Sequence, residues 1–140
     1  RKINESMPSY TVELLEQEFK KLNKSIKNAK IGILGLAYKA NVDDIRESPA
    51  LKIISILKEK KADVYVYDPY LKDKSNVNGL NELLGKSDYL ILVTDHKEFK
   101  DMDLGKLKEK GIKVVIDGRN CLDKERIKGL GIAYHGIGRA

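Results

Sequence analysis

The chain has 140 residues, of which 41% are hydrophobic, enough for one ordinary domain that buries about two-thirds of its unfolded surface. Its net charge of +6 comes from lysines scattered among nearly as many carboxylates, which favours a mixed-charge surface over a nucleic-acid-binding stripe and equally suits a small anionic ligand. The sequence has no signal peptide, no apolar run near the roughly 18 residues of a membrane span, and a single cysteine, Cys121, so we expect a soluble cytoplasmic protein without disulfides.

The first 28 residues have the pattern of one long helix. Residues 1–8 are largely polar and include Pro8, and because the chain does not begin with methionine we interpret it as a fragment of a longer protein. From Ser9 to about Asn28, apolar residues recur at spacings of three and four, with charged residues on the opposite face. The apolar positions are Val12, Leu14, Leu15, Phe19, Leu22 and Ile26. We therefore predict an amphipathic helix over this range.

Five short apolar runs follow, and the segments between them carry helix signals. The runs are residues 30–36, 63–68, 88–94, 113–118 and 132–137. Ser48 and Pro49 are typical of a helix N-cap and first helical position. Further helices are predicted around residues 80–84, 104–110 and 123–128. We predict an α/β fold with a doubly wound, mostly parallel, Rossmann-like sheet of five strands, preceded by the long helix.

Ligands of such sheets bind beyond the carboxyl ends of the strands, so the loops at that edge form the candidate site. These loops are residues 36–47, 69–79, 94–103 and 118–122, with the tail from Gly136. Polar candidates in or beside them are Lys39, Arg46, Asp68, Thr94, Asp95, His96, Arg119 and Asn120. Lys39, Arg46 and Arg119 would place three cations on one rim, which suits an anion.

Arginine is scarce in this chain, with five arginines against 22 lysines, so its use in two strand-end loops is informative. The planar guanidinium pairs bidentately with phosphate or carboxylate, whereas lysine supplies a point charge. The alternative is that Arg46 pairs with an acidic neighbour in its own loop, such as Asp43, Asp44 or Glu47. Composition alone leaves both interpretations open.

Two glycines and one aspartate partly resemble a dinucleotide fingerprint. Gly32 and Gly35 follow the expected spacing in part, but Leu34 and Tyr38 stand where further glycines are required, so a complete NAD site is not predicted. Asp68 ends the second predicted strand where a ribose-binding acid would lie. We favour the alternative, that its Asp-Pro sequence forms a turn.

The remaining reactive residues each have a structural interpretation that we favour. Asp95 and His96 could act as acid and base, but no partnered nucleophile is visible, so we expect a helix cap and a surface histidine. His135 is predicted to be a satisfied, half-buried strand residue, and Cys121 a small hydrophobe rather than a nucleophile. Two distant histidines and one cysteine lack ligand spacing, so no metal site is predicted.

Three motifs carry a family resemblance. GLAYKANVDDIRESPALKII, then VYVYDPY and VVIDGRN, closely resemble the C-terminal domain of the UDP-glucose/GDP-mannose dehydrogenase family, NAD-dependent enzymes that oxidise the C6 hydroxyl of a nucleotide sugar to a carboxylate. The resemblance spans about Ala29 to Gly138. INESMP and YHGIG resemble the branch that acts on UDP-N-acetyl-mannosamine. The first helix resembles the end of the central dimerisation region, which implies a boundary between residues 1–28 and 29–140.

The resemblance implies specific roles. Tyr38 and Lys39 match an aromatic-lysine pair that contacts the UDP-sugar, and Arg119 matches an arginine that also contacts the substrate. Arg46 matches an arginine that reaches NAD held by an N-terminal domain. The family's catalytic cysteine motif and its GxGxxG domain have no counterpart here, so Cys121 is not that nucleophile and the chain alone should be inactive.

We therefore expect the nucleotide-sugar-binding domain of an NAD-dependent UDP-sugar dehydrogenase, a homodimer when full-length, that makes a polysaccharide precursor and binds neither nucleic acid nor membrane. The alternative is a separate regulatory module that binds a nucleotide or anion without catalysis. A third hypothesis is a structural dimerisation piece that uses the first helix. The sequence upstream of Arg1 would separate the first two.

Overall fold

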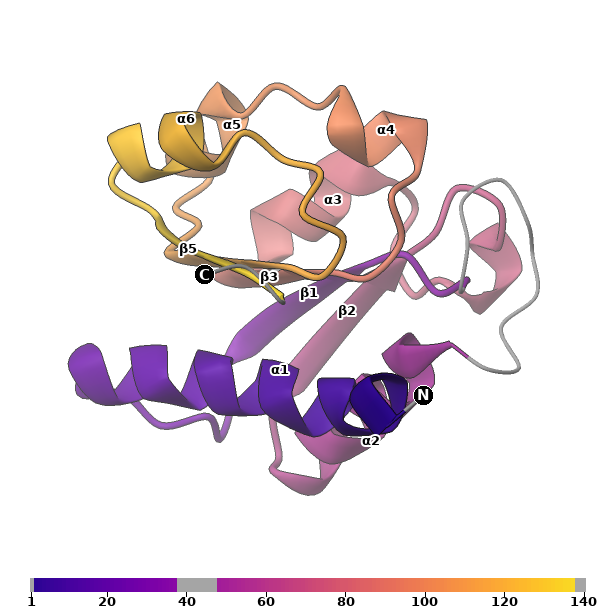
Figure 1. Ribbon diagram of the computed structural model, residues 1–140. Helices are drawn as coiled ribbons and strands as arrows, with labels where there is room; N and C mark the ends of the chain where they lie inside the picture. The colour runs from indigo at the N-terminus through magenta and orange to yellow at the C-terminus, as the bar shows by residue number, and fades with distance from the viewer. Residues whose placement is uncertain (1, 38–47, 138–140) are drawn as a thin grey trace.

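A computed structural model describes residues 2–37 and 48–137, with side chains from Met7 onward. Five strands form one parallel sheet, as predicted, and their order is β2-β1-β3-β4-β5 (Figure 1). The strands are β1 (Lys30–Leu34), β2 (Asp63–Tyr67), β3 (Tyr89–Leu92), β4 (Val114–Asp117) and β5 (Ala133–Gly136). The helices are α1 (Lys2–Lys21), α2 (Pro49–Glu59), η1 (Lys72–Lys74), α3 (Leu80–Lys86), α4 (Lys97–Lys100), α5 (Gly105–Glu109) and α6 (Lys124–Gly129). Each strand lies inside its predicted apolar run.

The order of the strands explains why helices cover both faces of the sheet. The chain moves from β1 to β2 in one direction and then back past β1 to β3, β4 and β5 in the other. Because parallel crossovers are right-handed, this reversal puts α2 on one face and α3, α5 and α6 on the other. Figure 1 shows these two layers, with α1 beside α2.

Helix α1 completes the face that α2 covers only in part. Its Val12, Leu15 and Phe19 are buried in one core cluster with residues of β1, β3 and β4. The ring of Phe19 contacts that of Tyr89 edge-on, with 4.6 Å between the ring centroids. A second core cluster lies on the opposite face, beneath α3, α5 and α6. Both faces of the sheet are therefore apolar, as the near-continuous apolar strands indicated.

The predicted bounds of the first helix were wrong at both ends. The backbone is already helical at residue 2, and Pro8 lies inside the helix without ending it. The helix stops at Lys21 because Asn23 adopts a left-handed conformation, φ 56°, and the Lys24 N–H then bonds back to the Phe19 carbonyl at 2.8 Å. This is a Schellman cap, which asparagine tolerates. Because the apolar spacing continues to Ile26, periodicity alone predicted a helix that extends beyond this cap.

The helix signals after the first strand correctly predicted four helices. Two shorter elements carry weaker signals or none. Ser48 caps α2, its Oγ accepting the Ala50 N–H at 3.1 Å, and Asp123 caps α6 by accepting the Arg126 N–H at 3.1 Å. The three predicted later helices correspond to α3, α5 and α6. The helix cap expected at Asp95 and His96 marks the start of α4, whereas η1 was not predicted, because three residues are too few to show periodicity.

One polar contact fastens α1 to the edge strand β5. His135 Nε2 lies 2.6 Å from Glu18 Oε2, so His135 is half-buried and satisfied, as predicted. Burial tends to raise the pKa of Glu18, but hydrogen bonds from His135 and Lys21 outweigh this and lower it. The pair thus holds a charged carboxylate at the helix-sheet contact.

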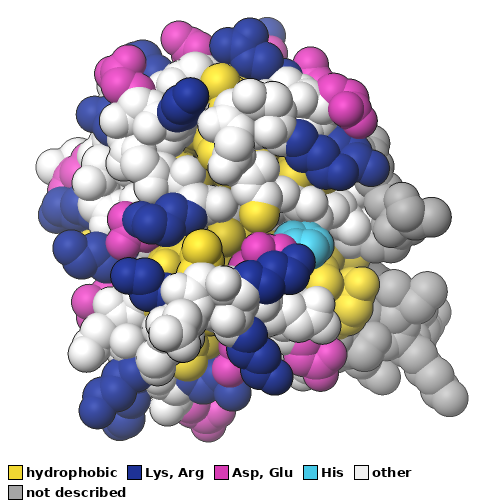
Figure 2. All heavy atoms as spheres, turned by 90° about the vertical axis from the view of Figure 1, so that its left-hand side faces the viewer, with side chains coloured by type: hydrophobic (Ala, Val, Ile, Leu, Met, Phe, Trp, Pro, Cys, Tyr) yellow, Lys and Arg dark blue, Asp and Glu magenta, His cyan; other side chains and the backbone are white. Residues whose placement is uncertain are grey.

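The surface agrees with the mixed-charge prediction on the side where the strands begin. Figure 2 shows that side with Lys and Arg groups interspersed among Asp and Glu, without a stripe of one sign. Among the described residues, none of the helices combines the length and apolarity that a bilayer span requires.

Candidate functional site

The candidate site lies where the strand order reverses, at the carboxyl ends of β1 and β3. Ligands of open α/β sheets bind at this point because the loops after the two strands diverge there. The described residues at this edge include Asp68 after β2, Thr94 and His96 after β3, and Arg119 after β4, with β1 between β2 and β3. The predicted site residues Tyr38, Lys39 and Arg46 lie outside the described residues, as do Asp43, Asp44 and Glu47.

Asp68 is fully buried at the end of β2. Its Oδ2 accepts the N–H groups of Leu36 at 2.7 Å and Ala37 at 3.2 Å, and its Oδ1 accepts the Tyr70 N–H at 2.9 Å. The bond to Tyr70 confirms the predicted Asp-Pro turn. A carboxylate with no exposed surface does not reach a ribose, so Asp68 is not placed to act as the ribose-binding acid of a Rossmann domain.

Thr94, after β3, holds the other backbone polar atom of Ala37. Its Oγ1 donates to the Ala37 carbonyl at 2.6 Å, and the side chain is fully buried. Gly35 makes this approach possible, because a Cβ there would lie 2.4 Å from Thr94 Oγ1 and the residue has φ +101°. The loop after β1 therefore leaves the sheet between β2 and β3 with its backbone held from both sides.

His96 is buried, and the prediction of a surface histidine was wrong. It is 1% exposed, its Nε2 lies 3.0 Å from Asp68 Oδ2, and its ring stacks on Tyr70 and meets Phe99 edge-on. It does precede α4 at the N-cap position, although its side chain does not cap that helix. The spacing of His96 and Phe99, three residues apart, was the available signal, because such a pair shares one helix face.

Arg119 lies in the loop after β4 with its guanidinium partly exposed. Its Nη2 lies 3.7 Å from Asp95 Oδ2, and its backbone N–H bonds to Asp117 Oδ1 at 3.1 Å. Gly118 before it is required by space, because a Cβ would lie 2.6 Å from the Leu92 carbonyl oxygen. Next to Arg119, Asn120 takes φ 55° and donates to the Ile137 carbonyl at 2.7 Å. The loop thus presents one cation from a well-fixed backbone.

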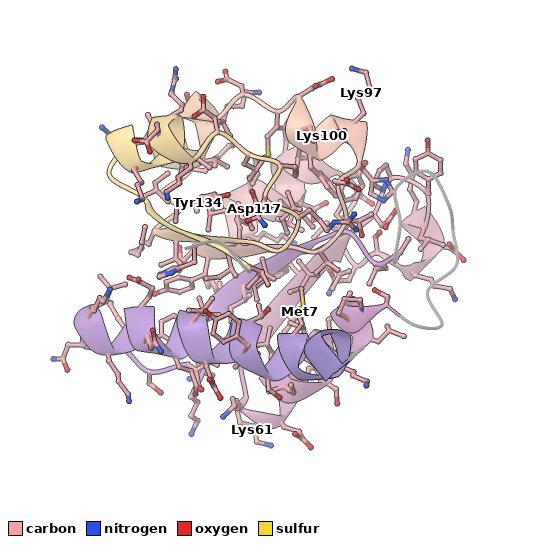
Figure 3. All side chains as sticks on the ribbon, viewed as in Figure 1. Met7, Lys61, Lys97, Lys100, Asp117 and Tyr134 are labelled. Carbon is pink, nitrogen blue, oxygen red and sulfur yellow. The ribbon has the colours of Figure 1, made fainter. Side chains whose placement is uncertain are left out.

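Asp117 organises that loop, and the sequence reasoning missed it. It is fully buried, and its Oδ2 accepts the Leu122 N–H at 2.9 Å and the Tyr134 hydroxyl at 2.7 Å. Figure 3 shows Asp117 and Tyr134 close together on β4 and β5. The signal was present, because Asp117 ends an apolar run just as Asp68 does.

Cys121 packs among apolar side chains of the second core cluster, in agreement with its prediction as a small hydrophobe. Burial, together with the nearby carboxylates of Asp117 and Asp95, raises the pKa of its thiol to about 11. The thiol therefore stays protonated at neutral pH, which disfavours a nucleophilic role.

The described residues provide a rigid rim with one arginine. Within residues 2–37 and 48–137, no group of three or more histidine, cysteine or acidic side chains is arranged to hold a metal ion. Asp68, Thr94 and Asp117 direct their polar atoms at the backbone of the loops. This arrangement suits binding of an anion at the rim.

Three comparisons place the chain among known proteins. Residues 32–124 match the model of the UDP-glucose/GDP-mannose dehydrogenase family, UDP binding domain. The UDP-N-acetyl-D-mannosamine dehydrogenase of Methanococcus aeolicus is 41% identical over 88% of this chain and 29% of its own length. The solved structure of the UDP-D-ManNAc dehydrogenase of Pyrococcus horikoshii is 37% identical, with a TM-score of 0.87, over 99% of this chain and 32% of that one.

A second solved structure shares the fold closely. The NDP-N-acetyl-D-galactosaminuronic acid dehydrogenase of Methanosarcina mazei Go1 is 29% identical, with a TM-score of 0.90, over 99% of this chain and 30% of that one. The chain thus spans about a third of the length of the relatives that it matches.

Proposed function

This chain belongs to the UDP-glucose/GDP-mannose dehydrogenase family, and we propose that it is the UDP-sugar-binding domain of an NAD-dependent UDP-sugar 6-dehydrogenase. The family match over residues 32–124 carries the proposal, since it includes every rim residue discussed above. The favoured substrate is UDP-N-acetyl-mannosamine, because relatives bearing that name match nearly the whole chain. The product, the uronate, would serve polysaccharide synthesis in the cytoplasm.

In this proposal Arg119, Tyr38 and Lys39 contact the UDP-sugar. A pyrophosphate presents several anionic oxygens, and a guanidinium binds two of them at once. Arg119 is suited to this because Gly118 and Asp117 hold its backbone while its side chain remains partly exposed. The carboxylate of Asp95, 3.7 Å away, orients the guanidinium before a ligand arrives.

The rest of the reaction is assigned to protein outside this chain. NAD would supply the hydride acceptor, held mainly by an N-terminal domain, with Arg46 of this chain reaching it. The described residues do not themselves form an NAD site, because Asp68 is buried and the glycine pattern is incomplete. Residues 1–28 would be the end of a central dimerisation region and residues 29–140 the UDP-sugar-binding domain, within a homodimer.

Binding of UDP to the 140-residue chain tests the proposal directly. UDP should raise the melting temperature, and Lys39→Ala or Arg119→Ala should each weaken binding about tenfold or more, since a charge-assisted hydrogen bond contributes about 1.5–3 kcal/mol. Lys113→Ala is the matched control, because Lys113 precedes β4 at the opposite end of that strand from Arg119. A melting temperature unaltered by millimolar UDP would contradict the proposal.

The substrate assignment needs the whole enzyme. Turnover of the full-length protein with NAD and a panel of UDP-sugars should be fastest with UDP-N-acetyl-mannosamine. Faster turnover of UDP-glucose would keep the enzyme class and change the substrate. A coding sequence that starts in frame at this chain would instead support the separate nucleotide-binding module.

A further inference from the structure

Both backbone polar atoms of Ala37 are bonded to side chains that follow the two strands flanking β1. Its N–H bonds to Asp68 Oδ2 at 3.2 Å, beyond β2, and its carbonyl accepts from Thr94 Oγ1 at 2.6 Å, beyond β3. The preceding N–H, of Leu36, also bonds to Asp68 Oδ2, at 2.7 Å. The chain therefore leaves the sheet in one fixed direction at Ala37.

His96 completes this arrangement by holding the carboxylate. Its Nε2 lies 3.0 Å from Asp68 Oδ2, while stacking on Tyr70, at 5.2 Å between ring centroids, and edge contact with Phe99, at 5.5 Å, fix the ring. The residue follows β3, so the contact joins the loops after β2 and β3 directly. We call Asp68, Thr94 and His96 the Ala37 clamp.

The side chains of the clamp have almost no exposed surface with which to contact a ligand at the rim. Asp68 and Thr94 have no exposed surface and His96 is 1% exposed. Burying three polar side chains is unfavourable unless each finds partners, and here the partners of Asp68 and Thr94 include the backbone of the two residues that lead into the loop. Tyr38 and Lys39 follow Ala37 directly in the sequence.

We propose that Asp68, Thr94 and His96 are positioning residues: they fix the backbone of Leu36 and Ala37 at the carboxyl end of β1, and binding of the UDP-sugar depends on that fixed end. The inference rests on the proposed function and adds three residues to it. A bound ligand gains most from a site whose backbone is already ordered, because ordering a segment on binding subtracts from affinity. The clamp orders Leu36 and Ala37 before binding.

A pair of substitutions at Thr94 tests the clamp with little change of shape. Thr94→Val removes the hydroxyl and leaves a side chain of nearly the same form, and Thr94→Ser keeps the hydroxyl. We expect Thr94→Val to weaken UDP binding about fivefold and to speed amide exchange at Leu36 and Ala37, and Thr94→Ser to stay within about twofold of the parent chain.

Ser87→Ala is the control for a purely structural effect. Ser87 lies before β3, at the other end of the strand, and its buried hydroxyl donates to the Leu83 carbonyl at 2.7 Å. It should lower the melting temperature as Thr94→Val does and leave UDP affinity unchanged. His96→Phe, which keeps an aromatic ring without the contact to Asp68, should weaken UDP binding in the same direction as Thr94→Val.

The outcomes separate the clamp from the proposed function. If Lys39→Ala loses UDP binding while Thr94→Val and His96→Phe bind as the parent chain does, UDP binding stands and the clamp is wrong. Equal losses of affinity in Thr94→Val and Ser87→Ala would also overturn it, since the effect would be one of general stability. If UDP does not change the melting temperature of the parent chain, the proposed function is wrong, and this inference with it.

Discussion

Two aspartates at the carboxyl edge of the sheet can be compared: Asp68 directly follows β2, and Asp117 is the last residue of β4. Each ends an apolar strand, each is fully buried, and each accepts at least three hydrogen bonds. A buried carboxylate is tolerated only when such donors satisfy it. In sequence and burial the two are nearly equivalent.

They differ in which parts of the chain they join. The partners of Asp68 lie in three loops, after β1, β2 and β3, so it links segments across the point where the strand order reverses. Asp117 bonds to Arg119 and Leu122 in its own loop and to Tyr134 on the neighbouring strand. Asp68 therefore ties separate loops together, whereas Asp117 closes one loop beneath Arg119.

Removing either carboxylate is expected to give the largest effect. Asp68→Ala and Asp117→Ala each leave several donors without an acceptor, at about 1–3 kcal/mol per buried donor, so both should lose about 3 kcal/mol or more of unfolding free energy in urea denaturation. Amide exchange should then separate them. Asp68→Ala should speed amide exchange at Leu36, Ala37 and Tyr70. Asp117→Ala should speed it only at Arg119 and Leu122.

If amide exchange in the Asp68→Ala variant accelerates only at Tyr70, then Asp68, like Asp117, holds only its own loop, and the two aspartates do not differ. If the alanine variants do not fold, Asp68→Asn and Asp117→Asn provide the same comparison, because one oxygen remains as an acceptor while the charge is lost.

A smaller effect is expected from the Tyr134 hydroxyl, which bonds the carboxylate of Asp117 to β5. Tyr134→Phe removes the 2.7 Å bond but leaves the Leu122 N–H on the same oxygen, so the unfolding free energy should fall by about 1 kcal/mol. Tyr10→Phe is the control, since Tyr10 is 46% exposed. Its unfolding free energy should differ from that of the parent chain by less than about 0.5 kcal/mol. Equal changes in the two variants would mean that the buried bond contributes nothing.

The last prediction concerns the reactivity of the thiol beside Asp117 in the unmutated chain. The pKa of Cys121 is raised from 9.0 to about 11 by burial and by nearby carboxylates, so the thiolate fraction at pH 8 should be about a hundredfold below that of the unfolded chain. Alkylation by iodoacetamide should be correspondingly slow in the native chain and should accelerate as the pH rises toward 11.

Asp117→Asn removes one of the charges that raise this pKa, so it should speed alkylation of Cys121 several-fold at pH 8. Circular dichroism would first establish that the variant remains folded. Native and unfolded chains that react at the same rate would contradict the raised pKa.

Much of the fold was predictable because its signals are local. Each strand is a short apolar run, and Ser48 with Pro49 marks the start of α2 with a capping hydroxyl. Predicted ends were less accurate, since the left-handed turn at Asn23 stops α1 while the apolar spacing runs on to Ile26. Capping depends on one backbone angle, and periodicity does not report it.

The places of the candidate residues at the carboxyl edge of the sheet were predictable, and their contacts were not. Parallel strands bring their carboxyl ends to one edge, so Asp68, Thr94, His96 and Arg119 were all candidates from the strand pattern. Their roles were not readable, because His96 is buried through contacts with Asp68 and Tyr70, residues that precede it by more than twenty positions. Such contacts exist only once β2 and β3 lie on either side of β1.

By itself the sequence determined the class of sheet, the edge that carries the candidate residues, and the family, because apolar period, strand ends and joined motifs all lie in neighbouring residues. The tertiary structure alone decided which of these polar residues stay exposed and which hold the backbone. Burial separates them: Arg119 keeps part of its surface in solvent, whereas Asp68, Thr94 and Asp117 keep none. The physical reason is that desolvation and hydrogen-bond satisfaction depend on neighbours far apart in the chain.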